Sequence, residues 1–204
     1  MLELNPVQLQ NQLADVRKAY RLLYQFQKRV LDILRLFEDE FSIEYYGGYA
    51  HFSNQTPAAS FGSLEDSAWD WLNLYLHEFH FREEELRYRY HINLSVFLVS
   101  DTGYFDTPNA EKNIIKTFVP ADQATTKLVF MIGKDAWHDG FDDFELNFKS
   151  KSPDYVRTTK KGKVLAKSFE LDAFSSQMGA IQAFRQLLNF WRENGIFELT
   201  MKHL

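Results

Sequence analysis

The chain has 204 residues, of which 45% are hydrophobic and 16% aromatic, and its formal net charge is -5. This length is enough for one sizeable core, and the acidic balance excludes a general attraction to nucleic acid or anionic lipid. The absence of cysteine excludes disulfides, thiol catalysis and cysteine-ligated metal centres. The N-terminal residues lack the features of a signal peptide, and the apolar run Leu128–Ile132 is too short to span a bilayer. We therefore expect a single soluble, cytoplasmic domain over residues 1–204 with no membrane partner.

Helical spacing predicts one long helix over residues 6–41. Asn5 is a suitable N-cap, and Pro6 suits the first helical position. Apolar residues follow at alternating intervals of four and three positions, which aligns them on one side of a helix. This stripe consists of Leu9, Leu13, Val16, Tyr20, Leu23, Val30, Leu34, Phe37 and Phe41, with Gln27 as the one polar residue among them. We expect the stripe to be buried on the protein's own sheet, and a helix shared across a dimer is the alternative.

Residues 43–171 are expected to form the sheet. The Gly47-Gly48 pair indicates a bulge in the first strand, and the alternation of side chains predicts a long strand over residues 86–99. Residues 63–80 favour a buried helix, with a strand as the alternative, and residues 100–103 favour a turn. Shorter strands are expected at residues 114–119, 127–132, 144–149 and 164–171.

The last long element is a helix over about residues 174–194. Ser175 or Ser176 can cap its start, and Asn194-Gly195 is typical of a helix end. Residues 196–204 could form a last short strand. A long helix, a run of strands and a second helix together predict an α+β fold, with both helices packed on a mostly antiparallel sheet.

An acidic segment is a candidate metal site. Asp139, Asp142 and Asp143 offer the oxygen ligands that Mg²⁺ prefers, and Glu145 and Lys149 follow on a predicted strand. In a metal-dependent nuclease or phosphodiesterase, Asp142, Asp143 and Glu145 would bind the metal and Lys149 the phosphate. However, Lys149 lies about 13 Å from Glu145 along a straight strand, which is too far for both to share one metal-bound water. A solvated loop leading into an amphipathic strand is therefore the preferred interpretation.

Two groups of basic residues could bind an anion or a partner. One is the segment 149–167, whose lysines suit either a soluble hairpin tip or a contact with nucleic acid or an acidic protein. Its candidate residues are Arg157, Lys160, Lys161 and Lys163. The other group is Arg87, Arg89 and His91, which share one face of the predicted long strand and could hold a carboxylate or phosphate.

His77 and His80 are a further candidate pair. On a helix they would lie three positions apart on one side and could share a metal ion. The surrounding residues are apolar, so hydrogen-bonded, half-buried histidines are the preferred interpretation.

The sequence contains no phosphate-loop, dinucleotide-binding or nucleophile-elbow pattern. This favours a non-catalytic interaction protein that binds a macromolecular partner, uses no cofactor and forms a homodimer through its N-terminal helix. A Mg²⁺-dependent nuclease or phosphodiesterase is the alternative. A small-ligand binder that uses Arg87 and Arg89 is a third hypothesis.

Overall fold

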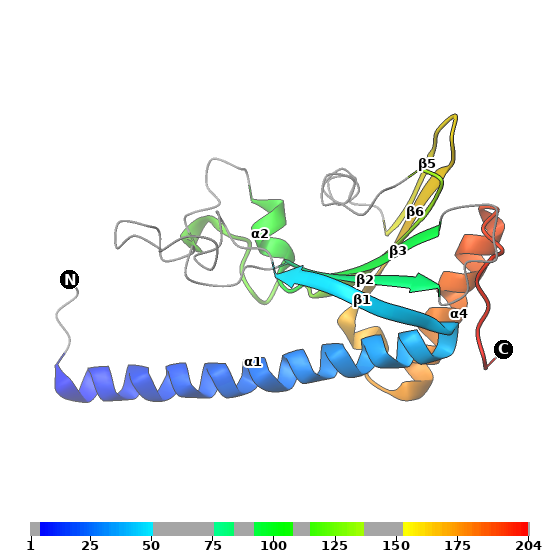
Figure 1. Ribbon diagram of the computed structural model, residues 1–204. Coiled ribbons are helices and arrows are strands. Elements are labelled where there is room, and N and C mark those ends of the chain that lie inside the picture. Colours follow the sequence, from blue (N-terminus) through cyan, green and yellow to red (C-terminus); the bar gives the residue numbers. More distant parts are fainter. Residues whose placement is uncertain (1–4, 51–75, 84–91, 108–114, 137–152, 204) are drawn as a thin grey trace.

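The computed structural model describes residues 5–50, 76–83, 92–107, 115–136 and 153–203. The predicted α+β fold is confirmed: a long N-terminal helix and a C-terminal helix accompany a six-stranded antiparallel sheet (Figure 1). The elements are α1 (Pro6–Phe41), β1 (Ile43–Ala50), β2 (Leu76–Glu83), β3 (Ile92–Val99), α2 (Thr102–Asp106), η4 (Ile115–Thr117), β4 (Lys127–Lys134), β5 (Asp154–Thr158), β6 (Lys163–Glu170), η5 (Leu171–Phe174) and α4 (Gln177–Glu193). The strand order is β1-β2-β3-β4-β6-β5.

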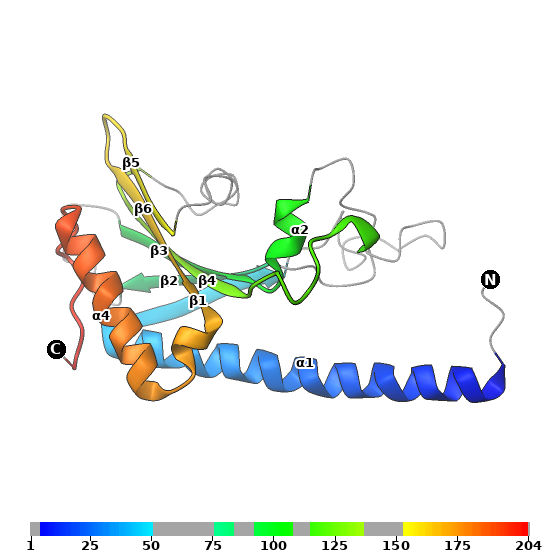
Figure 2. The ribbon, with the colours of Figure 1, turned by 180° about the vertical axis from the view of Figure 1, so that it is seen from behind.

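Helices α1 and α4 pack on the same face of the sheet, as Figure 2 shows from behind. Phe37 of α1 lies at the centre of their contact and is completely buried. Its ring centroid lies 5.4 Å from that of Phe81 on β2, 5.0 Å from that of Phe130 on β4 and 5.3 Å from that of Phe184 on α4. This aromatic cluster therefore joins both helices to the centre of the sheet.

The expectation that the whole stripe of α1 is buried is wrong for its N-terminal half. Val30, Leu34 and Phe37 are buried, whereas Leu13 is 46% exposed and Leu23 58% exposed. The reason is length: α1 has 36 residues and spans about 54 Å, whereas an eight-residue strand such as β1 spans about 27 Å. The sheet can cover only about half of this helix.

Several local predictions are confirmed. The side chain of Asn5 accepts a hydrogen bond from the backbone N–H of Gln8, and Ser176 caps α4 in the same way. The pairing of β1 with β2 shifts register between Tyr45 and Gly47, which is the expected bulge. Gly195, just after α4, has a φ of 83°, a left-handed conformation that favours glycine. Strands β4 and β6 lie close to the predicted segments.

Other local predictions are wrong. Residues 76–80 belong to strand β2, which is the alternative to the preferred helix, because their side chains alternate between two faces of the sheet. Residues 115–117 form a 3₁₀ helix instead of a strand, and Asp101 caps the short helix α2 where a turn was expected. Residues 196–203 form no strand, and strand β5 was not predicted. The parts of the predicted elements at 63–75, 86–91 and 144–149 lie outside the described residues.

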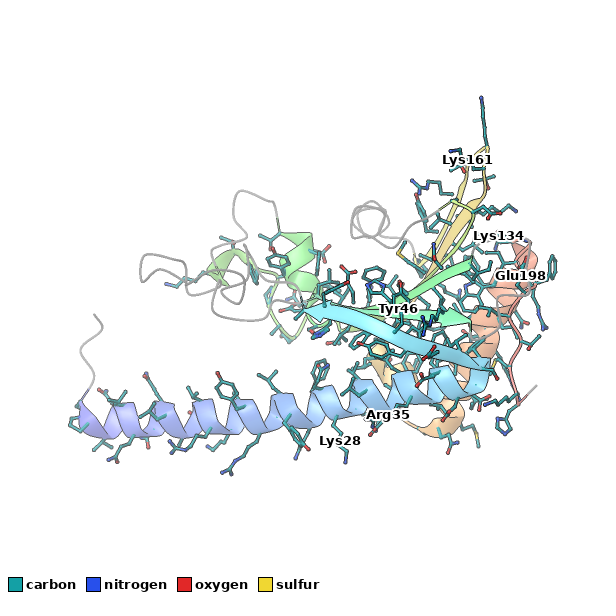
Figure 3. The ribbon with its side chains drawn as sticks, viewed as in Figure 1. Lys28, Arg35, Tyr46, Lys134, Lys161 and Glu198 are labelled. Carbon is teal, nitrogen blue, oxygen red and sulfur yellow. The ribbon has the colours of Figure 1, made fainter. Side chains whose placement is uncertain are left out.

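Side-chain contacts hold the segment after α4 against the rest of the fold. Glu198 forms an ion pair with Lys134 of β4, and both side chains are mostly buried (Figure 3). Burial acts to raise the pKa of Glu198, but the hydrogen bond from Lys134 and those from the backbone N–H groups of Glu198 and Phe197 lower it below its ordinary value. The charged form of Glu198 therefore stabilises the fold.

Replacing Phe37 with Ala should lower the free energy of unfolding by about 3–5 kcal/mol, because it opens a cavity among the buried rings of Phe81, Phe130 and Phe184. Thermal and denaturant unfolding would measure the loss. Met178→Ala is the control, since Met178 is 82% exposed and its loss should change stability by less than about 0.5 kcal/mol. Equal stability of the two variants would contradict the central position of Phe37.

Glu198→Gln should destabilise the protein at neutral pH by about 1 kcal/mol, because it removes a charged hydrogen-bond partner of Lys134. A lowered carboxyl pKa gives stability that is present above the unfolded-state pKa and lost as pH falls through the folded-state pKa. The difference from wild type should therefore disappear in acid. Urea unfolding as a function of pH would test this, with the exposed Glu193→Gln as the matched control; a pH-independent difference would contradict it.

Candidate interaction surface

The N-terminal half of α1 extends past the sheet (Figure 1). It carries a row of exposed apolar side chains. We call this row the free stripe. Its members are Leu9 (46% exposed), Leu13 (46%), Val16 (49%), Tyr20 (66%) and Leu23 (58%). These residues continue the spacing of the buried residues Val30, Leu34 and Phe37, so one apolar stripe is covered along its C-terminal part and open along its N-terminal part. A contiguous apolar row of this kind on a helix is typical of a surface that binds another helix.

The charges of this half of α1 lie mostly away from the free stripe. At about 100° per residue, Lys18, Arg21 and Lys28 fall on the other side of the helix, and Figure 3 shows Lys28 pointing away from the sheet. Lys18 also forms an exposed ion pair with Asp15, with 2.9 Å between Nζ and Oδ1. Within the described part of α1, Arg17 is the one charged residue that borders the free stripe. The stripe is therefore apolar with nearly uncharged edges.

The predicted basic group of the segment 149–167 is more dispersed than its sequence suggests. Lys160 and Lys161 are exposed at the tip between β5 and β6, where Figure 3 shows Lys161 pointing outward. In contrast, Lys163 donates a hydrogen bond of 2.8 Å to the backbone oxygen of Asn194, at the C-terminal end of α4. Lys167 pairs with Asp154 at 2.6 Å. The ammonium groups of both lysines are therefore bound to groups within the fold.

Arg157 lies on β5 and is half-buried, so it does not add to the exposed charge at the hairpin tip. Among the described residues of this segment, Lys160 and Lys161 are the lysines that remain exposed without a structural contact. Two lysines alone neutralise few phosphates of a nucleic acid.

The two histidines of β2 lie on opposite faces of the sheet and cannot share a metal ion. The ring of His77 stacks on that of Phe79 at 5.1 Å, while His80 is buried on the other face. There, His80 Nδ1 lies 2.7 Å from Ser95 Oγ, and its Nε2 lies 3.2 Å from Glu78 Oε2. The preferred interpretation of hydrogen-bonded, half-buried histidines is right for the hydrogen bond of His80, but His80 is fully rather than half buried.

Ser95, His80 and Glu78 resemble a hydrolase triad in residue types only. Ser95 has no exposed surface, and His80 and Glu78 are 3% and 4% exposed. A nucleophile must contact its substrate, which this burial prevents. The three side chains form a buried polar network between β2 and β3, bordered by the rings of Tyr46 and Tyr49.

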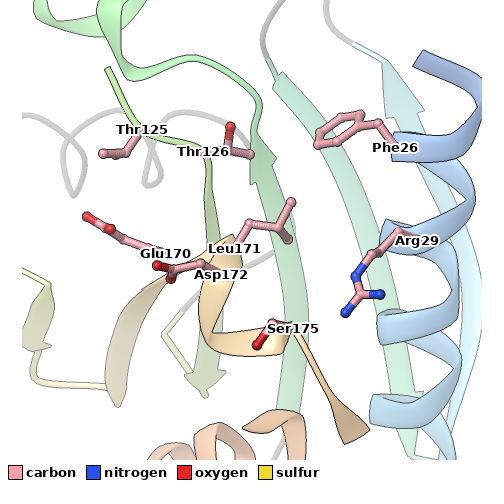
Figure 4. Close-up of a pocket in the computed structure, with 8 residues that line it drawn as sticks. All are labelled: Phe26, Arg29, Thr125, Thr126, Glu170, Leu171, Asp172 and Ser175. Carbon is pink, nitrogen blue, oxygen red and sulfur yellow. The ribbon is translucent and has the colours of Figure 1, made fainter. Parts of the chain in front are cut away.

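A pocket of about 580 Å³ lies where α1 leaves the sheet (Figure 4). Phe26 and Arg29 of α1 form one wall, and the residues around η5 form the other. Arg29 donates a hydrogen bond of 2.5 Å to the backbone oxygen of Phe174, which fastens α1 to η5 at this point. Glu170 and Asp172 are exposed at the opposite wall. The pocket thus marks the boundary between the covered and the free parts of α1.

The other predicted site residues lie outside the described part of the chain: Arg87, Arg89, His91, Asp139, Asp142, Asp143, Glu145 and Lys149. Within the described residues, no group of three or more His, Cys, Asp or Glu side chains is placed to hold a metal ion. The metal and catalytic hypotheses for the acidic segment remain predictions.

The model of one protein family, PM0109, matches residues 7–194. The chain belongs to the PM0109 family. No curated protein and no solved structure matches it. The region matched by the PM0109 model includes all residues of the free stripe. Among the described residues of this PM0109 protein, no helix has the length and apolar character needed to cross a membrane.

Ser95→Ala should destabilise this PM0109 protein by about 1–3 kcal/mol, because it leaves the buried Nδ1 of His80 without its hydroxyl partner. Thermal unfolding would measure the change. Ser168→Ala is the control, since its hydroxyl forms an exposed 3.3 Å hydrogen bond to Pro153. An unchanged melting temperature in Ser95→Ala would show that the network adds nothing to stability.

Proposed function

We propose that this protein is a non-catalytic, cytoplasmic interaction protein that forms a homodimer through the free stripe of α1. The observation that carries the proposal is the exposure of five apolar residues in heptad-like spacing on a helix that extends past its own sheet. When a second helix covers this exposed apolar area, the free energy falls by about 25 cal/mol per Å² of apolar surface that is buried. Binding, rather than chemistry, is the activity that this surface supports.

The charge distribution supports a second copy of the chain as the partner. Two free stripes face each other without bringing Lys18, Arg21 or Lys28 together, because these residues lie on the outer sides of both helices. An acidic partner would instead need basic residues along the edges of the stripe, where Arg17 is the one candidate among the described residues of α1. Apolar complementarity between identical helices is therefore a better match than charge attraction.

A Mg²⁺-dependent nuclease or phosphodiesterase has weaker support. Its proposed ligands lie outside the described residues, and Lys163 and Lys167 of the basic segment are engaged in structural contacts. Nucleic acid is accordingly not the partner that we propose.

Leu23→Asp should weaken dimerisation about 100-fold or more, because it places a carboxylate in the apolar contact of both copies. Sedimentation equilibrium over a range of concentrations would give the dissociation constant. Leu22→Asp is the matched control: Leu22 is 67% exposed, and it lies on the other side of the helix from the stripe.

Both variants should keep the wild-type circular dichroism and melting temperature of the monomer, since neither residue is buried within one copy. A wild-type protein that stays monomeric at high micromolar concentration would refute the proposed homodimer. Equal effects of Leu22→Asp and Leu23→Asp would show that the free stripe is not the contact surface.

A further inference from the structure

We infer that the two copies pair with their α1 helices antiparallel, so that the two sheets lie at opposite ends of the helix pair. This inference rests on the proposed homodimer and adds the arrangement of the partner. It follows from the position of two contacts along one stripe: the N-terminal part of the stripe faces the second copy, and the C-terminal part packs on the protein's own sheet.

A parallel partner that follows the stripe would meet the sheet. From Val30 onward the stripe is covered, with Val30 and Phe37 0% exposed and Leu34 5% exposed. The edge of the stripe is also occupied there, because Glu38 Oε1 accepts a 2.8 Å hydrogen bond from the backbone N–H of Tyr45 on β1. Packed helices lie about 8–10 Å apart, so the second helix would need the space that the sheet fills, where Phe37 already contacts Phe81 of β2 and Phe130 of β4.

An antiparallel partner avoids this conflict. Its helix runs along the free stripe and reaches its own N-terminal end near the place where the sheet begins to cover α1. Its sheet then lies beyond the N-terminal end of the first helix. The open part of the stripe, from Leu9 to Leu23, has a length of about 22 Å, which is enough for about four helical turns of contact.

In an antiparallel pair, the stripe residues of the two helices pack opposite each other in successive layers, and these residue pairs define the register. Leu13 of one copy packs opposite Leu23 of the second, and Val16 packs opposite Tyr20. Leu9 then lies opposite Gln27, the polar residue of the stripe, which is half-buried at the boundary with the sheet. This register uses every member of the free stripe.

The electrostatic free energy slightly favours the parallel pair, but its contribution is small. In this register Arg17 of one copy approaches Arg17 of the second, whereas a parallel pair would place it near Gln12. Repulsion between two exposed arginines costs only about 0.2–0.5 kcal/mol, because water and salt screen it. Overlap of a helix with a β-strand is forbidden, so the steric constraint decides the orientation.

Cysteine cross-linking tests the orientation directly, because the chain has no native cysteine. Leu13→Cys and Leu23→Cys would be made as separate proteins of different tagged mass, oxidised alone or after mixing, and run on non-reducing gels. Disulfides require Cα atoms within about 7 Å. In the antiparallel pair, two copies of residue 13 are about 15 Å apart, whereas residue 13 faces residue 23.

The expected result is a covalent dimer in the mixture that contains one chain of each mass, with little cross-linking of either protein alone. Strong cross-linking of each protein alone would overturn the inference in favour of a parallel pair. A dimer that is seen by sedimentation but forms no mixed disulfide would overturn the register and the contact. A monomer by sedimentation would mean that the proposed homodimer itself fails, which is a separate outcome.

Leu22→Cys is the matched control for chance collisions. It lies next to Leu23 in sequence and is similarly exposed, but on the other side of the helix. Mixing Leu22→Cys with Leu13→Cys should give at least about 10-fold less covalent dimer than mixing Leu23→Cys with Leu13→Cys. Equal yields would show that the disulfides report diffusion rather than a fixed helix pair.

Discussion

Eight-residue strands can cover only about half of a 36-residue helix, and the rest of the structure depends on this mismatch of lengths. The covered half of α1 supplies Val30, Leu34 and Phe37 to a core shared with α4 and the sheet. The other half repeats the same apolar pattern, but its side chains are exposed, and no described strand of the sheet covers them. In the homodimer that we propose, association uses the part of this amphipathic helix that folding leaves exposed.

Several charged residues act within the fold rather than on its surface. Lys163 binds the C-terminal end of α4, where the helix dipole and the free backbone oxygens favour a cation. Lys134 pairs with Glu198 and so holds the segment after α4 against the C-terminal end of β4. A cluster of lysines in a sequence is therefore a weak indicator of a binding surface until the partner of each ammonium group is known.

The sequence predicted the two long helices well because their caps and their apolar spacing are local signals. Asn5, Ser176 and Gly195 each act on backbone groups within a few residues, so no knowledge of the sheet was needed. Strand β2 was harder, because a strand buried on both faces loses the alternation of polar and apolar residues. Leu76, Glu78 and Phe79 are all buried, and that pattern is also compatible with a helix.

The candidate surface was only partly predictable for a similar reason. Spacing identified the stripe of α1, but it could not show where the sheet ends along it, since that depends on strand lengths and on the reversal of the chain at Ser42. Leu23 and Val30 look equivalent in the sequence, yet the first is 58% exposed and the second 0% exposed. The network of His80 and Ser95 was likewise not predictable, because it depends on the register between β2 and β3.

The continuity of α1 has a consequence for the thermodynamics of association. An isolated helix of about 20 residues in water is marginally stable, because its first turn fixes several dihedral angles for one hydrogen bond. Here the packed half from Val30 to Phe41 supplies that first turn, and the free half is only an extension of a helix that already exists. A partner that binds it does not have to order a flexible segment, so little conformational entropy is lost and more of the apolar contact energy remains as affinity.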